Sequence, residues 1–170
     1  MTAAPRIRRA TLTDLPALLA LERSAFTTDH LSPRQYRQHL VSPTALVLVA
    51  VDKSGLLGTA LVFFRRESDL ARLYSIAVAH GARGRGVGEA LLTAVERSAR
   101  ERGARRMRLE VHQGNASAMR LYERRGYVRF AERLGYYENG GHAWRYEKEL
   151  GLRAEGRGLK TFAPNKAGTV

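Results

Sequence analysis

Arg83-Gly84-Arg85-Gly86-Val87-Gly88 lies where the pattern of this 170-residue sequence changes, between a predicted strand, residues 72–78, and a predicted helix, residues 90–99. Glycines at such a junction allow a tight turn, so several backbone N–H groups can point at one anion near the helix N-terminus. Two arginines add positive charge to the loop. The stretch therefore predicts a loop that binds phosphate groups.

Two common phosphate-binding patterns fail on this loop. A P-loop requires Lys and then Ser or Thr after its last glycine, whereas Val87 and Gly88 stand there. The dinucleotide fingerprint G-x-G-x-x-G needs a small third residue, but its two possible frames place Glu89 or Leu91 there. Glu110, about twenty residues further on, only mimics the ribose-binding acid of that fingerprint. The loop also follows predicted antiparallel strands in the middle of the chain, which excludes the dinucleotide interpretation.

The rest of the chain predicts a single mixed α/β domain. A turn signal at residues 52–55 joins two β-rich runs into a hairpin, and the order of elements implies an antiparallel first half with a crossover in the middle. We expect a domain over residues 1–150 and an appended basic tail over residues 151–170. The expected order is β-α-α-β-β-β-α-β-α-β-β, with strands at 6–9, 45–51, 57–64, 72–78, 106–112, 127–132 and 143–150 and helices at 12–26, 33–40, 90–99 and 115–126.

The composition excludes several kinds of chemistry. The chain has no cysteine, which removes thiolate nucleophiles, disulfides and cysteine zinc sites, and its histidines are isolated, so no metal is expected. No run approaches the ~18 apolar residues of a membrane span, so we expect a cytoplasmic protein without a membrane partner. The net charge of +13 comes from dispersed arginines. It fits a nucleic-acid surface, an arginine-rich solvated surface or attraction of a small polyanion, and charge alone does not choose between them.

The third phosphate-binding pattern, R-x-x-G-x-G, fits Arg83, Gly86 and Gly88, and here the chain resembles the GNAT superfamily of acetyl-CoA-dependent N-acetyltransferases. The match continues in residues 109–127, LEVHQGNASAMRLYERRGY. This stretch is most similar to ribosomal-protein alanine N-acetyltransferases, which have a Leu-Glu-Val strand, a following Asn, and a Leu-Tyr-Glu helix that ends at Gly-Phe or Gly-Tyr. The resemblance implies a splayed central sheet flanked by helices, with acetyl-CoA as co-substrate between strands 72–78 and 106–112.

Two candidate bases occupy one face of the strand at 106–112. Glu110 and His112 point away from the apolar residues that alternate with them. A protonated amine must lose a proton before it attacks a thioester, and either side chain could take it, directly or through water. Glu110 could instead only pair with one of the many arginines. The resemblance favours Glu110 as the catalytic base, while His112 remains a rival.

The resemblance also implies roles for residues around the cofactor. Tyr122 would protonate the departing CoA thiolate, although a tyrosine in that position is more often a core aromatic. Asn115 would touch CoA as well as cap the helix that follows it. Backbone groups of the strand would bind the pantetheine arm and help polarise the thioester carbonyl. The expected cofactor-binding residues are Ile76, Ala77, Val78, Arg83, Gly84, Arg85, Gly86, Val87, Gly88, Glu89 and Asn115.

Tyr136 and Tyr137 are the candidate acceptor-binding residues, because the turn at residues 136–141 links the last two strands where this family builds its acceptor site. A peptide α-amine, with a pKa of about 7.7–8.0 against about 10.4 for lysine, is the easier amine for one carboxylate to deprotonate. We therefore expect a protein or peptide N-terminus as the acceptor, with a small-molecule amine as the alternative. A basic module that binds ribosomes or nucleic acid is the rival class, although no RNA-recognition strand is visible.

Overall fold

The computed structural model of this chain describes residues 3–151. The predicted tail, residues 151–170, lies outside the described residues except for Gly151. The strands are β1 (Arg6–Arg9), β2 (Ala45–Asp52), β3 (Gly55–Phe64), β4 (Leu70–Val78), β5 (Arg106–His112), β6 (Val128–Arg133) and β7 (Ala143–Glu149). The α-helices are α1 (Leu15–Ala25), α2 (Pro33–Val41), α3 (Val87–Glu101) and α4 (Ala116–Arg124), with short 3₁₀ helices η1 (Leu12–Asp14) and η2 (His80–Ala82).

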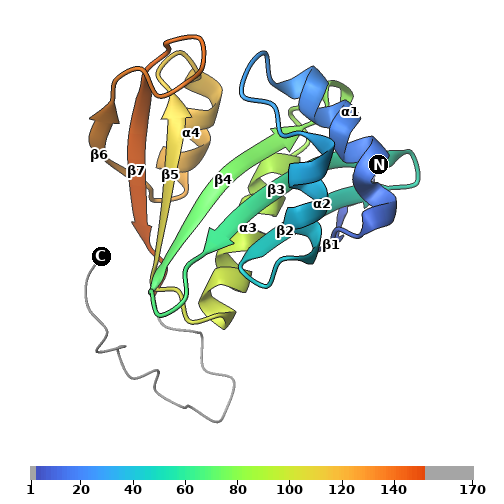
Figure 1. The fold of residues 1–170 in the computed structure, drawn as a ribbon, viewed down its shortest axis with the longest axis horizontal. Coiled ribbons are helices and arrows are strands. Elements are labelled where there is room, and N and C mark those ends of the chain that lie inside the picture. Colours follow the sequence, from blue (N-terminus) through green and yellow to red (C-terminus); the bar gives the residue numbers. More distant parts are fainter. Residues whose placement is uncertain (1–2, 152–170) are drawn as a thin grey trace.

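The strands form one mixed sheet in the order β1-β2-β3-β4-β5-β7-β6 (Figure 1). Strands β1 to β4 are antiparallel neighbours, β4 and β5 are parallel, and β7 inserts antiparallel between β5 and β6. The parallel pair is connected through α3, as a crossover requires. This arrangement confirms the predicted α/β class, element order and central crossover.

Local signals explain most element boundaries. Ser32 accepts a hydrogen bond from the Gln35 N–H at 3.2 Å and so caps α2. Where one helix was predicted from residue 12, η1 precedes α1. Pro16 accounts for this break, because its ring would clash with the carbonyl of residue 12 in a continuous α-helix.

Helices cover both faces of the sheet. Helices α1 and α2 pack on one face of β2 and β3, where Tyr36 and Leu18 are fully buried. Helix α3 covers the opposite face, and its Leu91 and Leu92 join one core with Met107 of β5. Helix α4 lies beside β5 and β7 (Figure 1). No helix within residues 3–151 is long and apolar enough to cross a membrane.

The sheet splays open between β4 and β5. Their pairing covers only Leu70–Leu73 against residues 106–109, although both strands continue beyond it. On the other side of β4, Leu73 lies opposite Val62 and Ser75 opposite Leu61, so Tyr74 is an extra, bulged residue. A β-bulge bends its strand and increases the local twist. The bend at Tyr74 therefore begins where β4 leaves β5, and the two strand ends diverge (Figure 1).

Candidate active site

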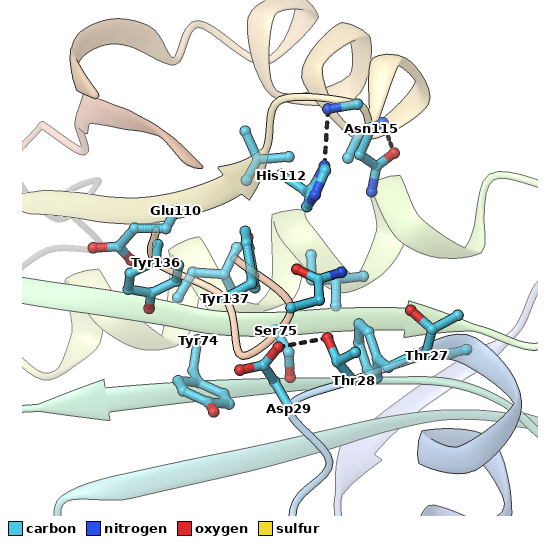
Figure 2. Close-up of a pocket in the computed structure, with 18 of the residues that line it drawn as sticks. Thr27, Thr28, Asp29, Tyr74, Ser75, Glu110, His112, Asn115, Tyr136 and Tyr137 are labelled. Atoms are coloured by element: carbon cyan, nitrogen blue, oxygen red, sulfur yellow. Dashed lines mark hydrogen bonds between the residues drawn. The ribbon is translucent and has the colours of Figure 1, made fainter. Parts of the chain in front are cut away.

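A cleft of about 810 Å³ occupies the space between the diverging strands. Its walls come from β4, β5, the N-terminal part of α4, the segment after α1 and the loop between β6 and β7 (Figure 2). Of the residues predicted from sequence, it brings together Ile76, Glu110, His112, Asn115, Tyr122, Tyr136 and Tyr137. Residues distant in the sequence thus meet at the end of the splayed strands.

Glu110 is the carboxylate of β5 that faces this cleft, and its side chain is only 6% exposed. Arg72 Nε donates to Glu110 Oε2 at 3.2 Å, and Arg145 Nε lies 3.5 Å from Oε1. The ion pairing considered from sequence therefore exists, but with other arginines than those on its own strand. Arg106 and Arg108 of that strand instead contact Glu147. Glu110 is consequently held by two cations while it lines the cleft.

His112 lies on the same strand face and is held in one orientation. Its Nδ1 accepts the Gly114 N–H at 2.9 Å, and its ring centroid lies 5.1 Å from that of Tyr137. A neutral imidazole has one nitrogen that accepts and one that carries hydrogen. Because Nδ1 is the acceptor here, the proton of neutral His112 lies on Nε2. The Nδ1 lone pair, with which His112 would have to accept a proton as a base, is therefore already used by the Gly114 N–H.

Tyr122 lies on α4 with 7% of its surface exposed. Its ring packs edge-on against Tyr127, with centroids 5.6 Å apart, and within residues 3–151 its hydroxyl has no hydrogen-bond partner. Burial raises the pKa of this phenol well above its usual value, so the group stays protonated at neutral pH. Asn115 Oδ1 accepts the Ala118 N–H at 3.1 Å, so its predicted role as the α4 cap is confirmed.

The adjacent tyrosines form one wall of the cleft. The rings of Tyr136 and Tyr137 meet edge to face, with centroids 4.9 Å apart (Figure 2). Burial raises the pKa of both hydroxyls, so both remain neutral hydrogen-bonding groups. The Tyr136 hydroxyl also accepts a hydrogen bond from Arg72 Nη2. The wall is thus aromatic, and the hydrogen bond between Arg72 and Tyr136 connects it to β4.

The opposite wall is the segment after α1, residues 26–32, of which residues 26–29 line the cleft. The family resemblance implies that residues 26–36 form this other wall, although they match the family only loosely. Buried Glu22 accepts the Leu31 N–H at 3.0 Å and the Tyr36 hydroxyl at 2.9 Å, which anchors this segment to α2. Across the cleft, the Asp29 N–H donates to Glu138 Oε2 at 3.3 Å, and the Glu138 N–H donates to Asp29 Oδ1 at 3.2 Å. These reciprocal bonds join loops 109 positions apart, so no local pattern could reveal them.

Arg72, which contacts two residues of the site, was also not predicted from the sequence. Its signal was a lone arginine between the buried residues Ala71 and Leu73 of a strand otherwise rich in apolar residues. Its partners are Glu110 and Tyr136, and it is the buried Glu110 carboxylate that needs a cation close by. The identity of those partners depends on the splay and on the last loop, and neither is a local property.

The glycine–arginine loop lies at the end of β4 and outside the lining of this cleft, as do Ala77 and Val78. Gly84 and Gly86 have φ of +76° and +75°, and a Cβ on either would meet no atom within 4 Å. Gly86 is the N-cap of α3. A glycine is favoured at this position by the left-handed backbone conformation and not by a lack of space. Arg83 is exposed, and Arg85 pairs with Asp52 at 3.3 Å.

The loop suits an anion by its chemistry. The free N–H groups of the first turn of the 15-residue helix α3, two left-handed glycines and two arginines make a positive, open concavity. A Cβ added at Gly88 would lie 3.5 Å from Leu121 and 3.6 Å from Val78, so α4 and β4 lie next to this turn. Glu89 is exposed and its carboxylate lies 3.6 Å from Arg125. The loop therefore adjoins the same end of the sheet as the cleft.

Comparison with known proteins gives consistent results. Residues 15–127 match the acetyltransferase (GNAT) family. A Bacillus subtilis (strain 168) protein, provisionally named a ribosomal protein bS18 alanine N-acetyltransferase, is 30% identical over 135 residues, which cover 79% of this chain and 88% of the relative. The crystal structure of the ribosomal protein S18 alanine N-acetyltransferase from Escherichia coli superposes with a TM-score of 0.78 at 25% identity, covering 91% of this chain and 99% of the other.

A second similar structure shares the fold at lower identity. It is Arabidopsis thaliana NAA60 in complex with acetyl-CoA, with a TM-score of 0.77 at 18% identity, covering 85% of this chain and 98% of the other.

Proposed function

Because this chain belongs to the acetyltransferase (GNAT) family, we propose that it transfers the acetyl group of acetyl-CoA directly to the α-amine of a peptide or protein N-terminus. The observation that carries the proposal is the cleft in which Glu110, Tyr122 and the Tyr136–Tyr137 pair meet at the splayed end of β4 and β5. A proton acceptor, a proton donor and an aromatic wall then surround one reaction space.

The donor would bind along β4 and the start of α3. Its phosphates fit the loop Arg83–Gly88 and the N–H groups of Val87, Gly88 and Glu89, because these donors face an open and positively charged position. The pantetheine arm fits β4 at Ile76, Ala77 and Val78, since no strand of the described part of the chain pairs with the β5 side of β4 beyond Leu73. Asn115 adds an amide at the mouth of the cleft.

Glu110 is the proposed base. The amine nitrogen forms a bond to the thioester carbon, and Glu110 takes the proton that the nitrogen loses, directly or through a water. His112 is less suited, because its Nδ1 lone pair accepts the Gly114 N–H. Arg72 and Arg145 contact the two carboxylate oxygens of Glu110 and so hold its side chain at the cleft.

Tyr122 is the proposed acid. When the C–S bond breaks, the electron pair goes to sulfur, and the Tyr122 hydroxyl can supply the proton that the thiolate takes up. Its burial keeps the phenol protonated, and its hydroxyl is not bonded to another group within residues 3–151. The two proton transfers balance, and no covalent acetyl-enzyme is needed in a chain without cysteine.

A peptide acceptor is supported by the shape and chemistry of the far walls. Tyr136 and Tyr137 face the segment 26–32, and the Asp29–Glu138 hydrogen bonds bridge the two. A bridged opening of this kind admits an extended N-terminus more easily than a lysine on a folded surface. The relatives named as alanine N-acetyltransferases support the same choice.

An acceptor panel tests this proposal. Hexapeptides that begin with a free alanine amine should release CoA, whereas the same peptides with an acetylated N-terminus and an internal lysine should not. Release is read with a chromogenic thiol reagent, and the absence of cysteine from the chain removes any protein background. Activity confined to small amines such as spermidine, or equal rates on blocked lysine peptides, would contradict the peptide N-terminus.

A further inference from the structure

The Arg72 side chain forms hydrogen bonds with both the proposed base, Glu110, and the proposed acceptor wall, at Tyr136. We infer that Arg72 is a positioning residue that holds Glu110 and Tyr136 in a fixed relation during acetyl transfer. This inference rests on the proposed function, in which Glu110 takes the proton of the amine. Arg72 itself does not line the cleft, whereas both of its partners do.

The contacts of Arg72 connect three elements. Arg72 lies on β4, its Nε donates to Glu110 Oε2 of β5 at 3.2 Å, and its Nη2 donates to the Tyr136 hydroxyl in the loop before β7. Its guanidinium also lies 5.9 Å from the ring centroid of Tyr74, the bulged residue that lines the cleft. A guanidinium has its donors in a rigid plane, so two simultaneous bonds fix the relative position of the two acceptors.

The position of this side-chain link matters because the backbone pairing of β4 with β5 does not extend to Glu110. Main-chain pairing of β4 with β5 ends at Leu73 and Leu109, one residue before Glu110. Glu110 is paired through its backbone only with Arg145 of β7. The Arg72 side chain therefore bridges the two halves of the sheet at the point where they separate, which is also where the reaction space begins.

The chain supplies a matched control in Arg108. It is the register partner of Arg72 across the β4–β5 pair, and the exposed fractions of the two side chains are similar, 31% and 40%. Arg108 Nε donates to Glu147, which does not line the cleft, and its guanidinium lies 5.1 Å from the Phe130 ring centroid. Loss of Arg108 removes an equivalent charge from the same sheet face without touching Glu110 or Tyr136.

The test compares Arg72→Met, Arg72→Lys and Arg108→Met, with acetyl-CoA and a hexapeptide carrying a free N-terminal alanine. For Arg72→Met we expect kcat to fall about tenfold or more, with KM for acetyl-CoA within about twofold of the wild-type value. Arg72→Lys should restore part of kcat, and Arg108→Met should leave both kcat and KM for acetyl-CoA at the wild-type values.

A double substitution separates positioning from a structural role. If Arg72 acts through Glu110, Arg72→Met should lower kcat far less in a Glu110→Gln background than in the wild type. Thermal unfolding with and without acetyl-CoA verifies that each variant folds and binds the donor. The inference is overturned if Arg72→Met and Arg72→Lys are as active as Arg108→Met, or if Arg72→Met has the same effect in both backgrounds. A fully active Glu110→Gln single variant would instead refute the proposed base.

Discussion

At the scale of single residues, the chemistry of the site depends on which groups can accept a proton and which can donate one. Glu110 lines the cleft between two arginines, the lone pair of His112 is used by the Gly114 N–H, and the Tyr122 phenol is kept protonated by burial. These three environments support the proposed roles of Glu110 as base and Tyr122 as acid, with His112 as a bystander.

The roles predict the kinetics of conservative substitutions. Glu110→Gln and Tyr122→Phe keep the shape of the side chain and remove its proton function, so each should lower kcat by about 10²-fold with KM for acetyl-CoA nearly unchanged. Steady-state rates of CoA release measure the effect. His112→Ala is the comparison, and a loss larger than that of Glu110→Gln would make His112 the base.

Asp14 predicts a pH dependence of stability far from the cleft. Arg8 donates two hydrogen bonds to the Asp14 carboxylate, each 2.8 Å long, and they lower the pKa of Asp14 to about 2. A depressed folded-state pKa contributes stability that is present above the unfolded value, about 3.9, and is lost as the pH falls toward 2. Asp14→Asn should therefore lower the unfolding midpoint at pH 6 and have little effect at pH 2. Asp69→Asn, which removes one half-exposed 3.3 Å contact with Arg106, should be nearly neutral throughout.

At the scale of elements, the junction of β4 and α3 forms the proposed cofactor site. Gly84 and Gly86 both take a left-handed conformation, and the space around each is open. A side chain at either position would not clash with neighbouring atoms, but it would strain the backbone of its own residue. The orientation of the N–H groups at the start of α3 depends on this conformation.

Gly86→Ala should therefore weaken donor binding more than it affects folding. The strain of an alanine at φ +75° is about 1–2 kcal/mol, enough to favour another loop conformation and to lower acetyl-CoA affinity about tenfold. Isothermal titration with acetyl-CoA measures it. Gly81→Ala is the matched control, because its Cβ also meets nothing within 4 Å and its φ is not in the left-handed region. Equal affinities of the two variants would show that the loop does not hold the phosphates.

At the scale of the whole molecule, two cores on opposite faces hold a sheet that is open only at one end. One core joins α1 and α2 to β2 and β3, and the other joins α3, α4, β5 and β7. The net charge of +13 is carried by the whole chain, and many of its arginines are engaged in ion pairs on the surface. The positive charge is of the sign that attracts the proposed polyanionic donor, and it would attract nucleic acid in the same way.

This predicts which ligand stabilises the protein. Acetyl-CoA at about 100 times its Kd should raise the free energy of unfolding by about 2.7 kcal/mol and so raise the melting temperature. A single-stranded RNA should have at most a small effect that disappears between about 50 and 200 mM salt. Differential scanning fluorimetry at both salt concentrations distinguishes the two ligands. Stabilisation by RNA but not by acetyl-CoA at the higher salt concentration would favour the nucleic-acid-binding class.

Much of the fold was predictable from the sequence because its signals are local. The strand and helix patterns, the cap at Asn115, the turn at residues 52–55 and the glycine loop each depend on neighbouring residues alone. The same holds for the strand face that Glu110 and His112 share, since alternation along a strand determines it. The sequence by itself therefore determined the element order, the mixed sheet and the position of the glycine–arginine loop.

Only the tertiary structure decided how these elements form a site. The bulge at Tyr74 opens the sheet, Arg72 reaches Tyr136 across 64 positions, and Asp29 meets Glu138 across 109. Contacts between residues so far apart in the sequence depend on how the two halves of the sheet pack. No periodicity or capping pattern in the sequence indicates that packing. Which arginines pair with Glu110 follows from the same packing.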